Sequence, residues 1–408
     1  MNVVDLTNPD NFDPTPPHDT FAVLRREDPV HWHDEADGPG FWCITKYEDV
    51  KHISRNPQVF SSWLGGTNMF DLSETDLAGV RMLMLNMDPP MHVKFRSIVS
   101  KGFTPRRVGM LKQHLEDLAR SIVDAIAEQG ECEFVDSVAS QLPMQTICEM
   151  LGVPESERQY VYDLSNRLIG FDDPDFQTSM DDGRIAAAEM HAYAEQLAER
   201  KKKEPGDDLT TLLLHAEVDG ERLSQLEYDS FFLMLAIAGN ETTRTVTAQA
   251  MRLLSEHPEA KQRIVADLSL LPTAVEEILR YAPAVIHFRR TATEDTELRG
   301  KKIRKGDKII LWYPSANRDE DVFDDPQAFD ITRSPNDHLA FGIGEHYCLG
   351  ANLARLQLNT ILRELLSRLP DIEACGEIKF LRSNFIDGIK ELPVRFTPES
   401  KQQRRASL

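Results

Sequence analysis

The stretch FGIGEHYCLG, residues 341–350, places Cys348 directly before a segment with the apolar periodicity of a helix. A sulfur at a helix entry faces unpaired backbone N–H groups and the positive end of the helix dipole, which favour the thiolate. The thiolate is the form of cysteine that binds a metal. Gly350 allows close approach of a flat ligand, and Gly342 with Gly344 permits a tight turn. Taken alone, the pattern also fits a glycine-rich loop with an incidental buried thiol.

A second candidate for chemistry is the acid–hydroxyl pair Glu241-Thr242. It follows FFLMLAIAG, residues 231–239, a run that is apolar on every face and therefore typical of a helix buried all round. A carboxylate in such a helix is costly unless it is paired or takes up a proton. Two interpretations stay open for this pair. Either it handles protons, or Thr242 bonds to a carbonyl one turn earlier while Glu241 meets a salt-bridge partner.

Charged residues at helical spacing form further candidate sites. His92 and Arg96 lie four residues apart after two prolines, so they share a helical face on which two donors can hold a carboxylate. Glu277 and Arg280 lie three residues apart on another predicted helix, and Arg290 occupies a strand-like position. Each feature taken singly is explained by a solvated face or a surface ion pair.

Together these residues resemble the cytochrome P-450 family, the haem-thiolate monooxygenases. FGIGEHYCLG matches the family's Phe-x-x-Gly-x-x-x-Cys-x-Gly haem loop, Glu277 and Arg280 match its Glu-x-x-Arg helix, and AGNETT matches its oxygen-activating helix. The resemblance implies a fold that is mainly α with small β-sheets (α+β). It also implies one large helical domain over residues 1–398, with haem b held between a long central helix and the helix after Cys348.

The resemblance also implies a role for each matched residue. Cys348 is the expected thiolate ligand of the haem iron, with Phe341 and Gly350 beside the ring. The expected holders of the two haem propionates are His92, Arg96, Arg290 and His346. A buried triad that braces the haem loop is expected from Glu277, Arg280 and Arg333. Thr242 is expected to contact the bound dioxygen, and Glu241 to relay protons.

The reaction implied by the resemblance inserts one atom of O2 into a C–H bond and consumes two electrons and two protons. One alternative is a peroxide-driven haem-thiolate peroxygenase, and another is a haem sensor or ligand carrier without turnover. The Glu241-Thr242 pair favours the O2-activating enzyme over both. Members that use peroxide tend to lack this pair, and a sensor needs no proton relay.

The substrate pocket is predicted to be apolar. By motif position, its lining residues are Met234, Ile237, Ala238, Val285, Ile286, Phe385 and Ile386. Burial of apolar surface favours a hydrocarbon skeleton, with a terpenoid or steroid side chain first, a fatty acid second and a polar antibiotic precursor last. The loop SSWLGGTNMFDLSETDLAG, from Ser61, is predicted to be a lid that contributes the apolar side chains Trp63, Leu64, Met69 and Phe70.

Electrons are expected from separate proteins, because the chain ends soon after the helix that follows Cys348. The expected donor is an iron–sulfur ferredoxin with an NAD(P)H-dependent ferredoxin reductase. An acidic ferredoxin requires a local basic surface. The candidate residues, which are equally explained as ordinary surface charge, are Lys94, Lys101, Arg106, Arg107 and Arg355.

Helices and short strands are expected to position these residues. Apolar residues at three- and four-residue spacing predict helices over 110–129, 184–203 and 349–369. A capping box at Ser224 begins the longest predicted helix, which runs to about Glu256. WHDEADGPGFWCIT predicts a hairpin, and TELRGKKIRKGDKIILWYP, residues 296–314, predicts two further strands. The tail from Glu399 is predicted to be disordered.

The composition limits the class of protein. The chain has 408 residues with 46 Lys+Arg and 67 Asp+Glu, and the resulting net charge of −21 disfavours a nucleic-acid binder. Five cysteines without a Cys-x-x-Cys pair suggest neither a disulfide framework nor a zinc site. Neither a signal peptide nor a run long enough to span a bilayer is evident. We therefore expect a protein without a membrane anchor, located in the cytoplasm.

Overall fold

The computed structural model describes residues 3–399, except 37, 171, 177–178 and 219. Helices dominate this range. Their bounds are α1 His18–Glu27, α2 Tyr47–Ser54, α3 Glu74–Val80, α4 Met91–Val99, α5 Pro105–Met110, α6 Lys112–Ile126, α7 Gln141–Leu151, α8 Arg158–Ile169, α9 Met180–Lys203, α10 Leu209–Leu214, α11 Gln225–Glu256, α12 Pro258–Ala266, α13 Leu271–Tyr281, α14 Tyr313–Ala316 and α15 Ala351–Arg368.

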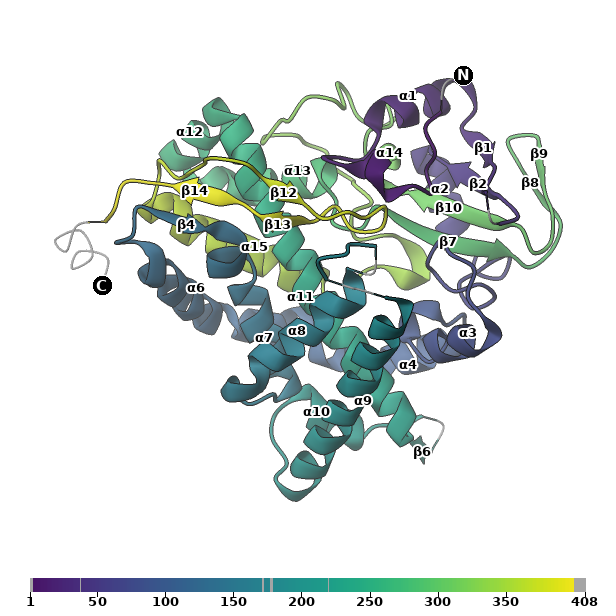
Figure 1. Ribbon diagram of the computed structural model, residues 1–408, viewed down its shortest axis with the longest axis horizontal. Coiled ribbons are helices and arrows are strands. Elements are labelled where there is room, and N and C mark those ends of the chain that lie inside the picture. Colours follow the sequence, from purple (N-terminus) through teal and green to yellow (C-terminus); the bar gives the residue numbers. More distant parts are fainter. Residues whose placement is uncertain (1–2, 37, 171, 177–178, 219, 400–408) are drawn as a thin grey trace.

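The strands are short and form small sheets. Their bounds are β1 Val30–His33, β2 Phe41–Ile44, β3 Phe60–Ser61, β4 Glu131–Glu133, β5 Glu217–Val218, β6 Glu221–Arg222, β7 His287–Ala292, β8 Thr296–Leu298, β9 Lys301–Ile303, β10 Lys308–Trp312, β11 Glu373–Ala374, β12 Lys379–Phe380, β13 Ile389–Glu391 and β14 Pro393–Arg395. A five-stranded sheet has the order β1-β2-β10-β7-β3, in which only β2 and β10 run parallel. Figure 1 shows this sheet beside α1 and α2, and α6 to α10 on the opposite side of the molecule. The mainly helical fold with small β-sheets is confirmed.

The long helix α11 runs through the helical part of the molecule (Figure 1). The Ser224 side chain accepts from the Glu227 N–H while the Glu227 carboxylate accepts from the Ser224 N–H, so the predicted capping box is present. Most of α11 is buried, and it contacts α7, α8, α9, α13 and α15. A helix that is covered on all sides can place residues on several internal surfaces at once.

Other predicted elements are present with changed bounds. The predicted helix 110–129 is interrupted at Leu111, because Thr104 caps a separate short helix with Pro105 in its first turn. The predicted helix 184–203 begins earlier, at Met180, where Ser179 supplies the cap. The hairpin of β1 and β2 is confirmed.

Residues 296–314 contain three strands rather than the two that were predicted. β8 and β9 form a hairpin at Gly300, and a turn at Gly306 leads into β10. Both glycines have positive φ, at +76° and +89°, which favours glycine at these turns.

The C-terminal end of the domain is fixed by an ion pair. Arg368 at the end of α15 donates from Nε to the Glu399 carboxylate at 3.0 Å. The predicted disorder therefore does not begin at Glu399, and the rest of the tail lies outside the described residues. Among the helices described, none combines the length and the apolar character that a membrane span requires.

Candidate active site

A cavity lies between the middle of α11 and the loop that leads into α15. One wall includes Ala238, Gly239 and Thr242 of α11, and the facing wall includes Cys348 and Gly350. The long central helix and the cysteine loop therefore enclose a common space. A flat ligand in this space would lie in contact with both.

The loop before α15 is held in a tight turn. The Cys348 N–H donates to the Phe341 carbonyl oxygen at 2.8 Å. Gly342 and Gly344 have φ of +65° and +77°, and a Cβ at Gly344 would collide with the carbonyl of Ser54. The shape of the loop therefore requires glycine at these positions.

Cys348 lines the cavity, and its sulfur is subject to opposing effects. Burial raises the pKa of the Cys348 thiol, while the N–H groups of Gly350 and Ala351 and the guanidiniums of Arg96 and Arg355 lower it. The N–H groups at the helix entry thus favour the thiolate, as expected, but the effect of burial is larger, and the pKa of the Cys348 thiol is raised. A metal cation bound to the sulfur reverses the balance, because coordination deprotonates a thiol outright.

Four nitrogen-bearing side chains gather at one edge of the cavity. They are His92, Arg96, Arg290 and His346. The ring centroids of His92 and His346 are 4.2 Å apart. Burial, followed by the charges of Arg96 and Arg290, lowers the pKa of His92 to about 4.

This edge contains donors without matching acceptors. His92 is fully buried, and neither ring nitrogen has a hydrogen-bond partner among the described residues. Arg290 is also buried and donates to the Arg289 carbonyl at 2.7 Å. The nearby Asp88 accepts instead from Ser61 and from the Ser62 N–H. Burial of the Arg290 guanidinium without a carboxylate partner among the described residues is unfavourable, so Arg290, with the donors of Arg96 and the two histidines beside it, fits a dianionic ligand such as the two propionates of haem.

Glu241 and Thr242 face different parts of the molecule. Thr242 lines the cavity, and its hydroxyl donates to the Ala238 carbonyl oxygen at 2.9 Å. Glu241 is fully buried outside the cavity lining and forms an ion pair with Arg244. Both contacts of the structural alternative considered from the sequence are therefore formed. Burial raises the pKa of Glu241, and Arg244 opposes the rise.

Arg244 connects Glu241 to α8. Its guanidinium donates to the Tyr162 hydroxyl at 2.9 Å and to the Asn166 side chain at 2.8 Å. Asn240 donates to the other oxygen of Glu241 at 3.0 Å. The carboxylate is thus held between α11 and α8, and it must leave Arg244 before it can reach the cavity.

The structure brings Glu277, Arg280 and Arg333 together. Arg280 donates to both oxygens of Glu277 at 2.8 Å, and Arg333 approaches the same carboxylate at 3.1 Å. Arg280 also donates to the carbonyls of Asn317 and Pro326. Glu277 and Arg280 are fully buried and Arg333 is partly buried, so the network ties α13 to the irregular segment that precedes the cysteine loop.

Three of the seven predicted pocket residues line the cavity, namely Met234, Ala238 and Val285. The other four, Ile237, Ile286, Phe385 and Ile386, do not. Consecutive residues of an extended segment point to opposite faces, so Val285 turns to the cavity while Ile286 packs near Trp312 in another core. Ile237, Phe385 and Ile386 belong to a small apolar cluster against which Val285 also packs.

Other apolar lining residues lacked a sequence signal. Leu85, Ile147 and Phe288 reach the cavity from separate segments. A Cβ on Gly239 would lie 2.8 Å from Ile147, so α7 approaches α11 closely at that glycine. The glycine was visible in the sequence, but its partner was not.

The predicted lid side chains do not line the cavity. Met69 is fully buried in the core that contains Trp312, whereas Leu64 and Phe70 are exposed. Arg81 lies over the Trp63 ring at 5.0 Å and donates to its carbonyl oxygen at 2.7 Å. Trp63 is thereby held against the segment that follows α3.

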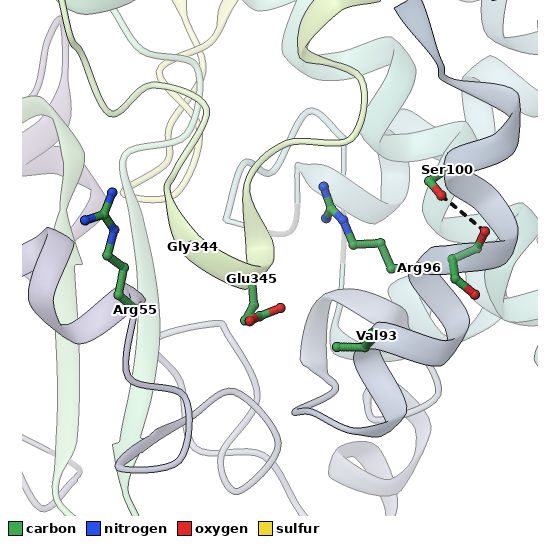
Figure 2. A pocket seen from close by; sticks show the side chains of 7 residues that line it. Arg55, Val93, Arg96, Ser100, Gly344 and Glu345 are labelled. Carbon is green, nitrogen blue, oxygen red and sulfur yellow. Dashed lines mark hydrogen bonds between the residues drawn. The ribbon is translucent and has the colours of Figure 1, made fainter.

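A surface cleft lies on the outer side of the cationic edge. It is lined by Arg55, Val93, Arg96, Ser100 and Glu345, among others. Figure 2 shows Arg55 and Arg96 on opposite sides of the loop, with Glu345 between them. Arg96 therefore belongs to both the cavity and the surface.

Comparisons with known proteins agree with this geometry. The family model for cytochrome P-450 matches residues 110–370. A methyl-branched lipid omega-hydroxylase of Mycobacterium bovis is 44% identical over 92% of this chain and 90% of its own. A steroid C26-monooxygenase of Rhodococcus jostii is 40% identical over 97% of this chain and 85% of its own. A Mycobacterium marinum cytochrome P-450 solved with pseudoionone has a TM-score of 0.88 and 38% identity, covering 93% of this chain and 94% of that one.

The cavity, the cysteine loop and these relatives together define a haem-dependent oxygenase. The chain belongs to the cytochrome P-450 family. It is a monooxygenase, and its cofactor is haem b. The residues that surround the cavity fit this group, since a cysteine lies on one face, and one edge holds the buried Arg290 and a His92 ring without hydrogen-bond partners among the described residues.

Proposed function

We propose that this monooxygenase hydroxylates a branched apolar molecule near the end of its chain. The observation that carries the proposal is the apolar wall around Ala238 and Thr242, which includes Met234, Val285 and Phe288. Such a wall offers an extended hydrocarbon favourable burial, at roughly 25 cal/mol per Å², and offers a polar molecule few hydrogen-bond partners. The order of preference is a terpenoid or steroid side chain, then a fatty acid.

Two relatives support this substrate class. One is named for hydroxylating a methyl-branched lipid at its omega end, and another for oxidising a steroid at C26. A solved relative was crystallised with pseudoionone. Branched hydrocarbon skeletons are the feature shared by these molecules.

Each residue matched to the family's site motifs has a proposed role. Cys348 ligates the iron, and the cofactor then supplies the oxidising chemistry. The cationic edge holds the propionates. The Thr242 hydroxyl, which donates its one proton to the Ala238 carbonyl oxygen, accepts a hydrogen bond from the cavity side, and Glu241 brings protons to the cavity after leaving Arg244. Because Glu241 is held away from the cavity, proton delivery depends on a change in its contacts.

We also propose that electrons come from an acidic ferredoxin. Its docking surface would comprise Lys94, Lys101, Arg106 and Arg107, all of which are exposed. Arg355 leaves the predicted set, because it pairs with Glu276 and is less exposed. α5 packs against α15, so this surface lies close to the helix that follows Cys348.

Spectral titration tests the substrate class. Terpenoids, steroids with a side chain, methyl-branched fatty acids and a polar macrolide are added to the ferric enzyme, and the haem spectrum reports binding. We expect tight responses from branched apolar compounds, followed by terminal hydroxylation when ferredoxin, reductase and NAD(P)H are supplied. Tight binding of the macrolide alone would refute the substrate class. Product formation with peroxide but not with NAD(P)H would refute the electron route.

Matched variants connect the binding result to the cavity. Val285→Phe fills space at the wall and should weaken binding of the preferred compound at least roughly tenfold, as expected for overpacking. Ile286→Val changes the adjacent residue, which faces another core, and should leave binding unchanged.

The role of Cys348 has a separate test. The reduced carbon monoxide complex of the wild-type protein should show the strongly red-shifted Soret band of thiolate ligation. Cys348→His should abolish that band. An unchanged spectrum would show that another residue is the ligand.

A further inference from the structure

Helix α13 carries two adjacent glutamates that hold different parts of the cysteine loop. Glu277 holds the buried network with Arg280 and Arg333 described above. Glu276 points to α15 instead, where Arg355 donates to both of its oxygens at 2.7 and 2.8 Å. Two parallel hydrogen bonds between a planar guanidinium and a carboxylate fix the orientation of the pair as well as its distance. The second glutamate therefore fixes the position of Arg355.

Arg355 in turn contacts two residues of the haem loop. Its guanidinium carbon lies 4.5 Å from the centre of the Phe341 ring, and a third N–H group points to the Tyr347 hydroxyl at 3.3 Å. Phe341 accepts the Cys348 N–H through its backbone carbonyl and also lines the cavity. One arginine thus contacts the residues at positions 341 and 347, which flank the turn leading to Cys348.

His338 contributes to the same arrangement. Its Nδ1 accepts from the Ala340 N–H at 3.2 Å, so the proton of the neutral ring resides on Nε2, which lies 3.1 Å from the Glu276 carboxylate. Glu276 is consequently held from two sides. Hydrogen bonds from His338 and Arg355 lower the pKa of Glu276 to about 2, against the effect of burial. The carboxylate is ionised at all ordinary pH values.

We propose that Arg355 and Glu276 are a positioning pair that fixes the shape of the loop around the Cys348 sulfur and tunes the reduction potential of the iron. The proposal rests on the proposed role of Cys348 as the ligand. The charge of Arg355 lowers the pKa of the Cys348 thiol and so stabilises negative charge on the sulfur. Such a cation reduces electron donation from a thiolate to iron and favours the more reduced, less positive metal. Arg355 also keeps Phe341 and Tyr347 in place, so the thiolate stays ligated.

Two substitutions at Arg355 separate charge from position. Arg355→Leu removes both, and Arg355→Lys keeps the charge without the planar fork or the stacking. We expect Arg355→Leu to shift the haem reduction potential to more negative values and to shorten the half-life of the red-shifted carbon monoxide band roughly fivefold, as for loss of a modest ion pair. Arg355→Lys should restore the potential but not the half-life.

Two further variants complete the design. Arg363, on the exposed side of the same helix, donates only to the Leu268 carbonyl among its described contacts. Arg363→Leu should therefore match the wild type in both measurements. Glu276→Gln weakens the hold on Arg355, so it should shorten the half-life in the same sense as Arg355→Leu. It provides the half-life test if Arg355→Leu fails to bind haem.

The outcomes are distinguishable. A wild-type protein without the red-shifted band would refute Cys348 as the ligand. A wild-type protein with the band, together with an unchanged potential and half-life in Arg355→Leu, would overturn the positioning pair alone. An unchanged half-life in Glu276→Gln would do the same.

Discussion

At the residue scale, Thr242 and Glu241 are neighbours in sequence whose side chains leave α11 in different directions. Successive residues of a helix are separated by about 100° around its axis, so the two cannot share a face. Thr242 reaches the cavity, and Glu241 reaches Arg244 and α8. The proposed proton path therefore has one fixed member and one that must move.

The hydroxyl of Thr242 is expected to control coupling of electrons to product. Thr242→Ala should retain haem and substrate affinity but divert electrons to peroxide, because protons then reach the wrong oxygen. Thr242→Ser should restore coupling. The ratio of product to NAD(P)H consumed measures this.

A matched control lies on the same helix. Thr247 donates to the Thr243 carbonyl at 2.8 Å in the same manner as Thr242 donates to Ala238, but it does not line the cavity. Thr247→Ala should leave the ratio unchanged. Normal coupling in Thr242→Ala would contradict the proton path.

The buried guanidinium of Arg290 is expected to retain the cofactor. Arg290→Leu leaves a propionate without its partner, a loss of about 3 kcal/mol, which weakens haem affinity roughly a hundredfold. Haem transfer to apomyoglobin measures the affinity. Arg289→Leu is the control, because the adjacent residue of β7 pairs with Asp71 on the other face. Equal retention in both variants would refute the cationic edge as the propionate site.

At the element scale, α13 determines the stability of the segment before the cysteine loop. Glu277→Gln should lower the free energy of unfolding by about 3–5 kcal/mol, because it leaves the buried Arg280 and the partly buried Arg333 without a counter-charge. Urea unfolding and haem content measure the loss. Glu259→Gln, an exposed glutamate on α12, should change the free energy by less than about 0.5 kcal/mol. A stable, haem-loaded Glu277→Gln protein would show that the network is dispensable.

At the scale of the whole molecule, a net charge of −21 makes any basic docking surface local. Lys101→Glu combined with Arg106→Glu should slow reduction by an acidic ferredoxin several-fold at low salt, and the dependence on salt should become weaker. Stopped-flow reduction of the iron measures the rate. Lys302→Glu, on β9, places the same charge change on another exposed residue and should have little effect. A rate unaffected by the double change would exclude this surface.

The sequence alone determined the family, the cofactor and the helical nature of the fold. Local chemistry explains this success. The capping box at Ser224 and the glycines around Cys348 act over a few residues, so their consequences are visible without the rest of the chain. Spacing also indicated that Glu277 and Arg280 share a helical face, which their ion pair reflects.

Only the tertiary structure decided which side of each element faces the cavity and which charges pair. Val285 and Ile286 are equally apolar, but only one faces the site. Arg355 was expected at the ferredoxin surface, yet it pairs with Glu276 from a distant segment. Periodicity defines a face within an element, whereas the partner of that face depends on long-range packing. For this reason the ion pair of Glu241 with Arg244, the positions of Leu85 and Ile147 at the cavity, and the contacts that support the cysteine loop became visible only in the folded chain.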